Sequence, residues 1–266
     1  MVVEAPPSLA AAATRVRNVN LPLLRGALQR AGLDLPPQMA VTLIPEDDAR
    51  AARVPDWIAG LAIGDRDIVI FPDRVLAYPY DSLESVVRHE VTHLALTSRA
   101  GGQPLPRWFH EGVAVSVDAG WDTAAQLRLL VAMLGRPDIA ELTRLFTSDS
   151  QSETTQAYLL SAVLIDDLRD RRGPETPGAI AALVAAGVPF AQAFQRETSE
   201  SPDASAAHAW AGYRRWTAWV PAVTSPSAAW TLILLLAFAA FVAQRRRRAR
   251  RRRQWDAEDR LQVPFD

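Results

Sequence analysis

The stretch SVVRHEVTHLALTS, residues 85–98, contains two of the four histidines in the chain. His89 and His93 are four positions apart, and Glu90 directly follows the first of them. On a helix, residues four apart lie on one face about one turn from each other, so both imidazoles can point at a single ion. Glu90 points to the side of that face, where it can reach a water bound to the ion. The pattern H-E-x-x-H therefore predicts a metal site with a base beside it.

Short strands are predicted before this motif. MAVTLIP, residues 39–45, has the composition of a strand bounded by prolines. LAIGDRDIVIFP, residues 61–72, is typical of a hairpin that turns at Gly64-Asp65. The second strand of this hairpin, residues 67–71, is a candidate exposed edge on which an extended peptide can pair.

Helices are predicted on both sides of these strands. Residues 15–31 have apolar side chains at helical spacing, and Pro22 favours a break within them. The motif helix is expected to begin near Ser82, with Asp81 as its cap and Glu84 completing a capping box.

The second half of the chain is predicted to be mostly helical. A helix over residues 106–119 begins with a proline, which is favoured in a first turn. Further helices are expected over 124–135 and 155–173, both ending at glycines, and over 179–187 and 189–197, before a polar loop at 198–206 and a helix at 207–220.

Composition excludes several classes of protein. With 266 residues, 49% of them hydrophobic and 22% charged, the chain is neither disordered nor a polytopic membrane protein. Because cysteine is absent, the chain has no disulfides and no thiolate metal ligands. The net charge of −1 conceals a cluster of eight arginines between Arg245 and Arg253.

A membrane-spanning helix is predicted over residues 222–243, where no residue is charged. At about 1.5 Å per residue this segment spans roughly 33 Å, enough for a hydrocarbon core of about 30 Å. The arginines that follow favour a cytoplasmic tail at 244–266 and an extracytoplasmic position for the preceding domain. That topology needs an export signal, for which residues 1–13 are not convincing. A nucleic-acid-binding tail is the competing interpretation of the arginines, and no nucleic-acid partner is expected.

A third ligand for the predicted metal lies in PRWFHEGVAV, residues 106–115, where Glu111 follows His93 by eighteen positions. H-E-x-x-H followed by W-[LF]-x-E-G-x-A resembles the peptidase MA-like gluzincins, the zinc metallopeptidases related to thermolysin and aminopeptidase N. The resemblance implies that His89, His93 and Glu111 bind one Zn²⁺, the glutamate coming from a second helix antiparallel to the first. It also implies that Glu90 is the base.

The resemblance extends over about residues 35–215, with residues 1–34 as an N-terminal segment. It implies an α+β, zincin-like domain: a short N-terminal sheet, the H-E-x-x-H helix, the glutamate helix and a helical C-terminal part. The spacing from His93 to Glu111 is slightly shorter than in the best-known relatives. An AYxxS element places Tyr158 as a candidate to stabilise the oxyanion, although an aromatic core residue is an equally good interpretation. His110 is expected to be a bystander, because adjacent helical residues point about 100° apart.

The sequence thus predicts a membrane-anchored zinc metallopeptidase that hydrolyses peptide bonds through a zinc-bound water activated by Glu90. Its expected partners are a peptide or protein substrate and the membrane lipid around residues 222–243. One alternative is a non-proteolytic, membrane-tethered binding protein that keeps the gluzincin fold, although the intact Glu90 favours the enzyme. A scaffold that acts through its arginine tail is the other alternative, and it would bind in a strongly salt-dependent way.

Overall fold

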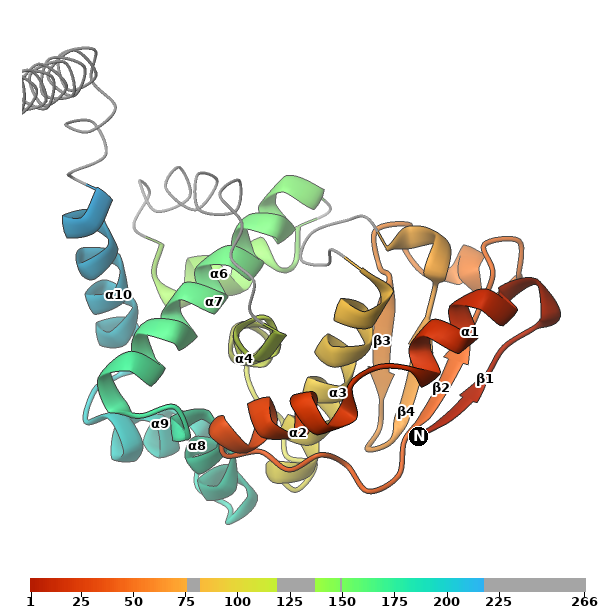
Figure 1. Ribbon diagram of the computed structural model, residues 1–266. Coiled ribbons are helices and arrows are strands. Elements are labelled where there is room, and N and C mark those ends of the chain that lie inside the picture. Colours follow the sequence, from red (N-terminus) through yellow and green to blue (C-terminus); the bar gives the residue numbers. More distant parts are fainter. Residues whose placement is uncertain (76–81, 119–136, 149, 218–266) are drawn as a thin grey trace, which may run out of the picture. The chain divides into compact units, whose positions relative to one another are not determined.

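The computed structural model describes residues 1–75, 82–118, 137–148 and 150–217, and it has an α+β fold that is mostly helical (Figure 1). The α+β class predicted from the sequence is confirmed. Helix α3 packs against the sheet on one side and against α4 on the other, and α4 in turn packs against α7. Residues 1–211 form one compact unit that contains all the side chains discussed below.

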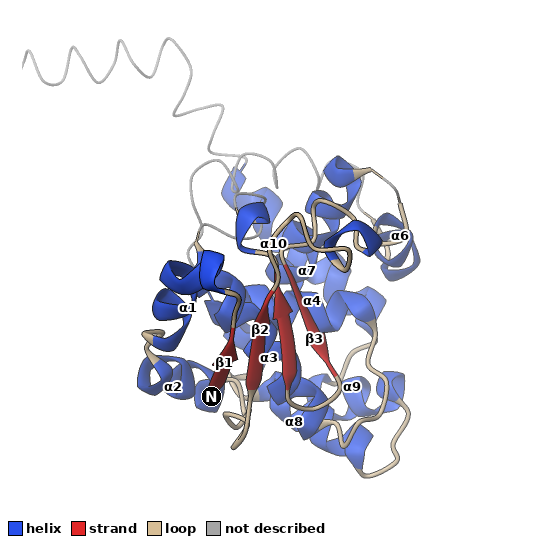
Figure 2. Ribbon diagram, turned by 90° about the vertical axis from the view of Figure 1, so that its right-hand side faces the viewer, coloured by secondary structure: helices blue, strands red, loops and turns tan. Residues whose placement is uncertain are grey.

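The sheet contains four short strands in the order β1-β2-β4-β3 (Figure 2). Their bounds are β1 Val2–Glu4, β2 Ala40–Leu43, β4 Asp67–Ile70 and β3 Gly60–Ile63. The pairs β1–β2 and β2–β4 are parallel, whereas β3 and β4 form the antiparallel hairpin predicted from the sequence. Alternate residues of β2 and β4 are buried, as expected for a sheet with a covered face: Val41, Leu43, Ile68 and Ile70.

Two expectations about the strands are corrected. The first strand, β1, was not predicted, and it adds residues of the N-terminal segment to the sheet. The segment at 67–71 is not an edge, because β4 lies between β2 and β3. Among the described strands, β3 lies at one edge of the sheet. The turn that joins it to β4 contains Gly64, whose φ is 66°.

The helical pattern over residues 15–31 corresponds to two helices, α1 (Ala10–Arg17) and α2 (Leu21–Arg30). Pro22 lies in the first turn of α2. Backbone N–H groups in a first turn have no partner within the helix, so the missing N–H of proline costs no hydrogen bond there. The side chain of Asn20 accepts a hydrogen bond from the backbone N–H of Leu23 and caps α2. The predicted interruption of the helical pattern therefore lies just before Pro22, between α1 and α2.

The motif helix α3 spans Leu83–Arg99. Its cap is Ser82, whose side chain accepts a hydrogen bond from the N–H of Ser85, and the predicted cap Asp81 lies outside the described residues. Glu84 lies in the first turn, where a negative charge favours the helix, and it forms an ion pair with Arg15 of α1.

Most of the helices that follow are close to those predicted, whereas α6 was not predicted. Helix α4 corresponds to the predicted glutamate helix, and α7 ends at Arg172, with Gly173 at φ 113° as its cap. The polar loop predicted at 198–206 is mostly wrong, because a helix begins at Pro202. The predicted helix at 124–135 lies outside the described residues. The α-helices in this half of the chain are α4 Arg107–Asp118, α6 Ile139–Leu145, α7 Gln151–Arg172, α8 Thr176–Ala185, α9 Phe190–Thr198 and α10 Pro202–Thr217. Short 3₁₀ helices span Pro7–Leu9, Ala51–Arg53 and Pro72–Arg74.

The loop between β2 and β3 is held on the sheet by a buried arginine. Arg74 donates two hydrogen bonds of 2.7 Å to the carboxylate of Glu46, and others to the backbone carbonyls of Ala51, Val54 and Pro55. A small apolar cluster lies beneath the loop: Ile44, Ala51 and Phe71, with Val54, Leu61 and Val69 packed against it. The loop is thereby fixed just before Trp57, a residue that lines the pocket described below.

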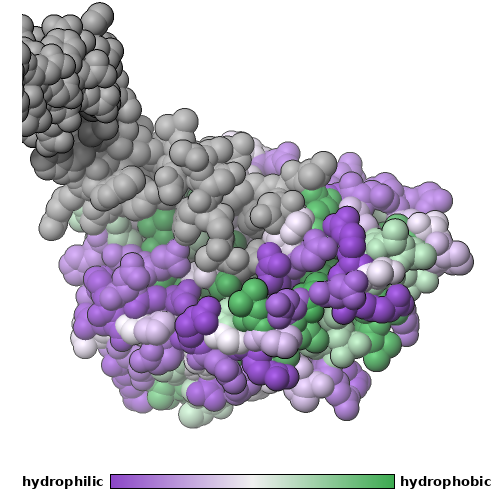
Figure 3. Space-filling model, in the orientation of Figure 1, coloured by the Kyte–Doolittle hydropathy of each residue, from purple (hydrophilic) through white to green (hydrophobic). Residues whose placement is uncertain are grey.

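Most of the described surface that Figure 3 presents is hydrophilic. Among the described residues, the large apolar side chains that are exposed are Val2, Leu23, Trp57 and Ile63. No helix in the described part of the chain combines the length and the apolar character needed to cross a membrane. The transmembrane helix predicted at 222–243 and the arginine tail at 244–266 both lie outside the described residues.

Candidate metal centre

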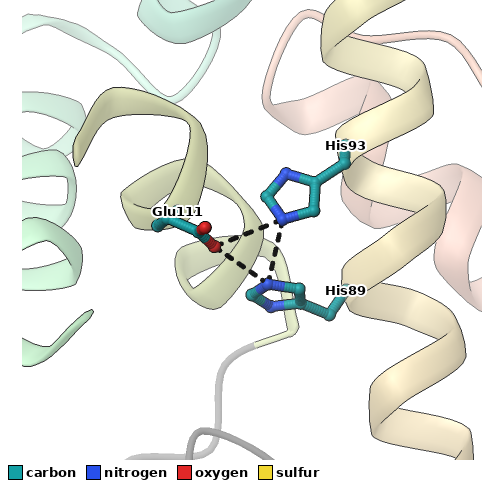
Figure 4. A group of neighbouring side chains, drawn as sticks. All are labelled: His89, His93 and Glu111. Atoms are coloured by element: carbon teal, nitrogen blue, oxygen red, sulfur yellow. Dashed lines mark hydrogen bonds and ion pairs between the residues drawn. The ribbon is translucent and has the colours of Figure 1, made fainter. Parts of the chain in front are cut away.

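Helix α3 presents both histidines of the motif on one face. His89 and His93 project from successive turns toward α4 (Figure 4), and their Nε2 atoms are 3.1 Å apart. His89 is 2% exposed and the side chain of His93 is 15% exposed. The helical spacing in the sequence therefore brings the two rings to one point, as predicted.

Helix α4 supplies the third side chain. The carbonyl of Pro106 accepts hydrogen bonds from the N–H groups of Phe109 and His110 and so begins this helix. Glu111, one turn along, directs Oε2 to within 3.3 Å of Nε2 of His89 and 3.2 Å of Nε2 of His93. Burial alone would raise the pKa of Glu111, but the two histidines hold it well below its usual value. The carboxylate is therefore ionised at neutral pH.

The three ligand atoms form a nearly equilateral triangle with sides of 3.1, 3.2 and 3.3 Å. Atoms bound about 2.0–2.1 Å from a tetrahedral metal are separated by roughly 3.3 Å, so the spacing of these donors matches that of a tetrahedral site. Two imidazoles and one carboxylate also form a donor set that suits a divalent metal. These side chains, of which His93 is half-buried and the other two are buried, could hold a metal ion.

Glu90 lies in the same pocket as this triangle. It is 2% exposed, and its carboxylate is next to the backbone of the edge strand at Gly60. A Cβ atom at Gly60 would lie 2.7 Å from Oε1 of Glu90 and 2.8 Å from Cγ1 of Val86. A glycine is therefore needed at this position for Glu90 to fit between α3 and β3.

A close contact between α4 and α7 brings Tyr158 to the site. The backbone of Gly112 packs so closely on α7 that an added Cβ would lie 2.5 Å from the carbonyl oxygen of Ser161. One turn before Ser161, the ring of Tyr158 lies edge-on to that of His89, with centroids 6.3 Å apart. Burial, and then the charge of Glu111, raise the pKa of Tyr158 well above its usual value, so its hydroxyl stays protonated at neutral pH.

Arg107 lies beside Glu111 in the same pocket as Tyr158. Its Nε is 3.5 Å from Oε1 of Glu111, the carboxylate oxygen that is not paired with the histidines, and its positive charge partly opposes the rise in the pKa of Tyr158. The guanidinium also donates a 2.9 Å hydrogen bond to the carbonyl of Phe146 and lies over that ring, 5.0 Å from its centroid. Nothing in the sequence identified Arg107 as a site residue, because its role depends on how α4 packs against α6 and α7.

His110 was expected to be a bystander, and the structure corrects this. Its Nδ1 lies 3.1 Å from Nδ1 of His93, the ring nitrogen of His93 that does not face Glu111. Burial, together with the neighbouring His93, lowers the pKa of His110 to about 4, so it is neutral at neutral pH. The direction of His110 on its helix separates it from Glu111, but it does not reveal that His110 can contact the other nitrogen of the His93 ring.

These residues surround an open pocket of about 400 Å³. One wall is formed by β3 and the preceding loop, including Trp57, Ile58 and Leu61, and another by the first turns of α7, including Gln151 and Thr155. The five residues singled out in the sequence, His89, Glu90, His93, Glu111 and Tyr158, all line it. The structure therefore brings together the whole set that the sequence placed in the site.

Comparison with protein family models found no match, and no curated protein has a significantly similar sequence.

Proposed function

We propose that the protein is a membrane-anchored, zinc-dependent metallopeptidase whose residues 35–215 form a zincin-like domain of the gluzincin type. The observation that supports this most directly is the triangle of His89, His93 and Glu111, with Glu90 in the same pocket. Three protein ligands and an open position are typical of catalytic zinc sites, whereas structural zinc sites have four protein ligands.

Zinc is the metal that this donor set favours most. Imidazole and carboxylate ligands in tetrahedral spacing suit Zn²⁺, whereas Mg²⁺ and Ca²⁺ prefer sites made of oxygen atoms alone. When bound, the ion would act as a Lewis acid that polarises a peptide carbonyl and makes a water more acidic. The chain contributes the three ligands, the base, and the hydrogen-bond donors around them.

Glu90 would act as the general base and then as the general acid. Its carboxylate accepts a proton from the attacking water and passes it to the leaving amine of the cleaved peptide bond. Two features hold this carboxylate in place: the rigid helix that also carries His89, and the strand backbone at Gly60. Because it adjoins His89 on the same helix, its position is fixed relative to the candidate metal ligands.

Tyr158 would stabilise the negative charge that develops on the carbonyl oxygen. Burial and the charge of Glu111 raise the pKa of Tyr158 well above its usual value, so the hydroxyl keeps the proton that it would donate to the substrate. The tyrosine lines the pocket beside His89, so this donor is in place before the reaction begins. Arg107 holds Oε1 of Glu111, which leaves Oε2 for the histidines.

An extended peptide is the substrate that fits the pocket best. The edge strand β3 lies along it, so the backbone of a peptide can pair with this strand while its side chains contact apolar residues such as Trp57 and Leu61. Residues 222–243 would anchor the domain in the bilayer and the arginines of 244–266 would remain in the cytoplasm, so the substrates would be peptides or proteins outside the cytoplasm.

The proposal is tested by peptide hydrolysis with the full chain purified in detergent and loaded with zinc. Cleavage of a mixed peptide library, followed by mass spectrometry, should be abolished by a chelator and restored by zinc. Glu90→Gln should keep the metal and lose activity by about 10²–10⁴-fold, the usual contribution of a general base. Glu84→Gln, on the first turn of the same helix, is the matched control. Unaltered turnover in Glu90→Gln would refute the mechanism, and zinc binding without any hydrolysis would favour the binding-protein alternative.

A further inference from the structure

We propose that His110 is a positioning residue for the metal site: it accepts a hydrogen bond from the Nδ1–H of His93 and so fixes the tautomer and the ring orientation of that ligand. This inference rests on the proposed metal site. It assigns a role to a histidine that neither the ligand set nor the proposed mechanism uses.

The contact joins the outer end of the His93 ring to α4. Nε2 of His93 faces Glu111 and His89, at 3.2 and 3.1 Å, whereas Nδ1 of the same ring lies 3.1 Å from Nδ1 of His110. The two rings are tilted by 43° with centroids 5.2 Å apart, so they are not stacked. His110 therefore contacts the side of His93 that is directed away from the metal.

The tautomers of both rings follow from this geometry. A histidine that binds a metal through Nε2 is neutral and carries its proton on Nδ1. Two Nδ1 atoms 3.1 Å apart form a hydrogen bond only if one donates and the other accepts. Since the Nδ1 of His93 must donate, the Nδ1 of His110 accepts, and the proton of His110 is on its Nε2.

This arrangement differs from the usual one in its charge. Metal-binding histidines most often donate to a carboxylate or to a backbone carbonyl. A neutral imidazole fixes the ring in the same way but adds no negative charge beside the site, so a bound ion would keep more of its Lewis acidity. Because His110 directly precedes Glu111, a single turn of α4 supplies one ligand and also orients another.

Zinc affinity, measured by competition with a chromophoric chelator on the full chain in detergent, tests the role without any substrate. His110→Ala should weaken zinc binding by about 10–100-fold, the usual effect of removing such a partner. His110→Asn should restore most of the affinity, because the amide oxygen can accept the same hydrogen bond. His208→Ala, which removes an exposed histidine from α10, should leave the affinity unchanged. Circular dichroism checks that each variant is folded.

The tautomers provide a second, independent measurement. With ¹⁵N-labelled histidine in the zinc-loaded protein, NMR should show His110 protonated on Nε2 and His93 protonated on Nδ1. A proton on Nδ1 of His110, or equal zinc affinity in wild type and His110→Ala, would overturn this inference and leave the proposed function intact. A folded wild-type protein that binds no zinc would overturn both.

Discussion

Oε2 of Glu111 lies 3.3 Å from Nε2 of His89, although the two residues are 22 positions apart in the sequence. The contact joins α4 to α3. Because α4 packs between α3 and α7, the packing of α4 on α7 determines how close Glu111 comes to His89. On the far side of α4, the backbone of Gly112 rests on the carbonyl of Ser161. The close approach of Gly112 to α7 thus helps to set the position of Glu111, the candidate ligand that precedes it.

Gly112→Ala should destabilise the protein. The new Cβ would lie 2.5 Å from the carbonyl oxygen of Ser161 and 2.7 Å from Cγ1 of Ile165, and α7 cannot move away without losing its own packing. Overpacking of this kind costs about 1–3 kcal/mol, which lowers the Tm by roughly 2–12 °C in a domain of this size. Thermal unfolding followed by circular dichroism measures it. Gly26→Ala, at an open position on α2, should raise the Tm or leave it unchanged.

Gly60→Ala should separate metal binding from catalysis. The atoms nearest to a Cβ at this position belong to Glu90 and Val86, and neither residue is a candidate metal ligand. Zinc content should therefore stay near that of wild type, while peptide turnover falls by about 10-fold or more as the base moves. Metal analysis and kcat on the same preparation decide the matter. If turnover stays at the wild-type level, the contact with Gly60 does not hold Glu90 in its working position.

Tyr158→Phe should keep the metal and slow the chemical step. Removing one preorganised donor to an oxyanion typically lowers kcat by about 10²–10³-fold, and the ring that contacts His89 and Phe146 is kept. Steady-state kinetics on a peptide selected from the library measures the effect. Thr155→Val, which removes a hydroxyl from the same pocket wall, should change kcat only slightly. Wild-type turnover in Tyr158→Phe would leave the tyrosine as a packing residue.

Stability should depend on the ionisation of Glu200, which connects α7 with α10. Burial opposes ionisation, but hydrogen bonds from His208, Arg172 and Ser205 and the charge of Arg171 lower the pKa of Glu200 from 4.5 to about 2. A carboxylate whose pKa is lower in the folded chain stabilises the fold above its unfolded pKa, and this contribution is lost as the pH falls toward the folded pKa.

The difference in Tm between wild type and Glu200→Gln should therefore be largest above pH 4.5 and should shrink as the pH falls toward 2. Glu197→Gln, an exposed carboxylate on α9, controls for the loss of one negative charge. A Tm difference that is independent of pH would show that the network around Glu200 makes no such contribution.

The local features of the site could be predicted because they depend on helical spacing. His89, Glu90 and His93 are fixed relative to one another by one helix, and Glu111 belongs to the next helix along the chain. Features that depend on packing could not be predicted. The role of His110 requires knowing which end of the His93 ring faces α4, and that of Gly60 requires knowing which strand lies beside Glu90.

The sheet was predicted incompletely for a similar reason. Strand β1 has only three residues, too few to show an alternating pattern, and it pairs with β2 across more than thirty intervening residues. The strand at 67–71 was expected to be an edge because its hairpin partner was the only neighbour that the sequence identified. The parallel pairing with β2, which covers its other side, leaves no local signal.

The most direct test of the account is the zinc content of the purified full chain, compared between wild type and Glu111→Ala. Two imidazoles and one ionised carboxylate at tetrahedral spacing predict about one zinc per chain in the wild type and a large loss in the variant. A wild-type protein that is folded by circular dichroism and still takes up no zinc would contradict the account, because the histidine pair would then not form a working metal site.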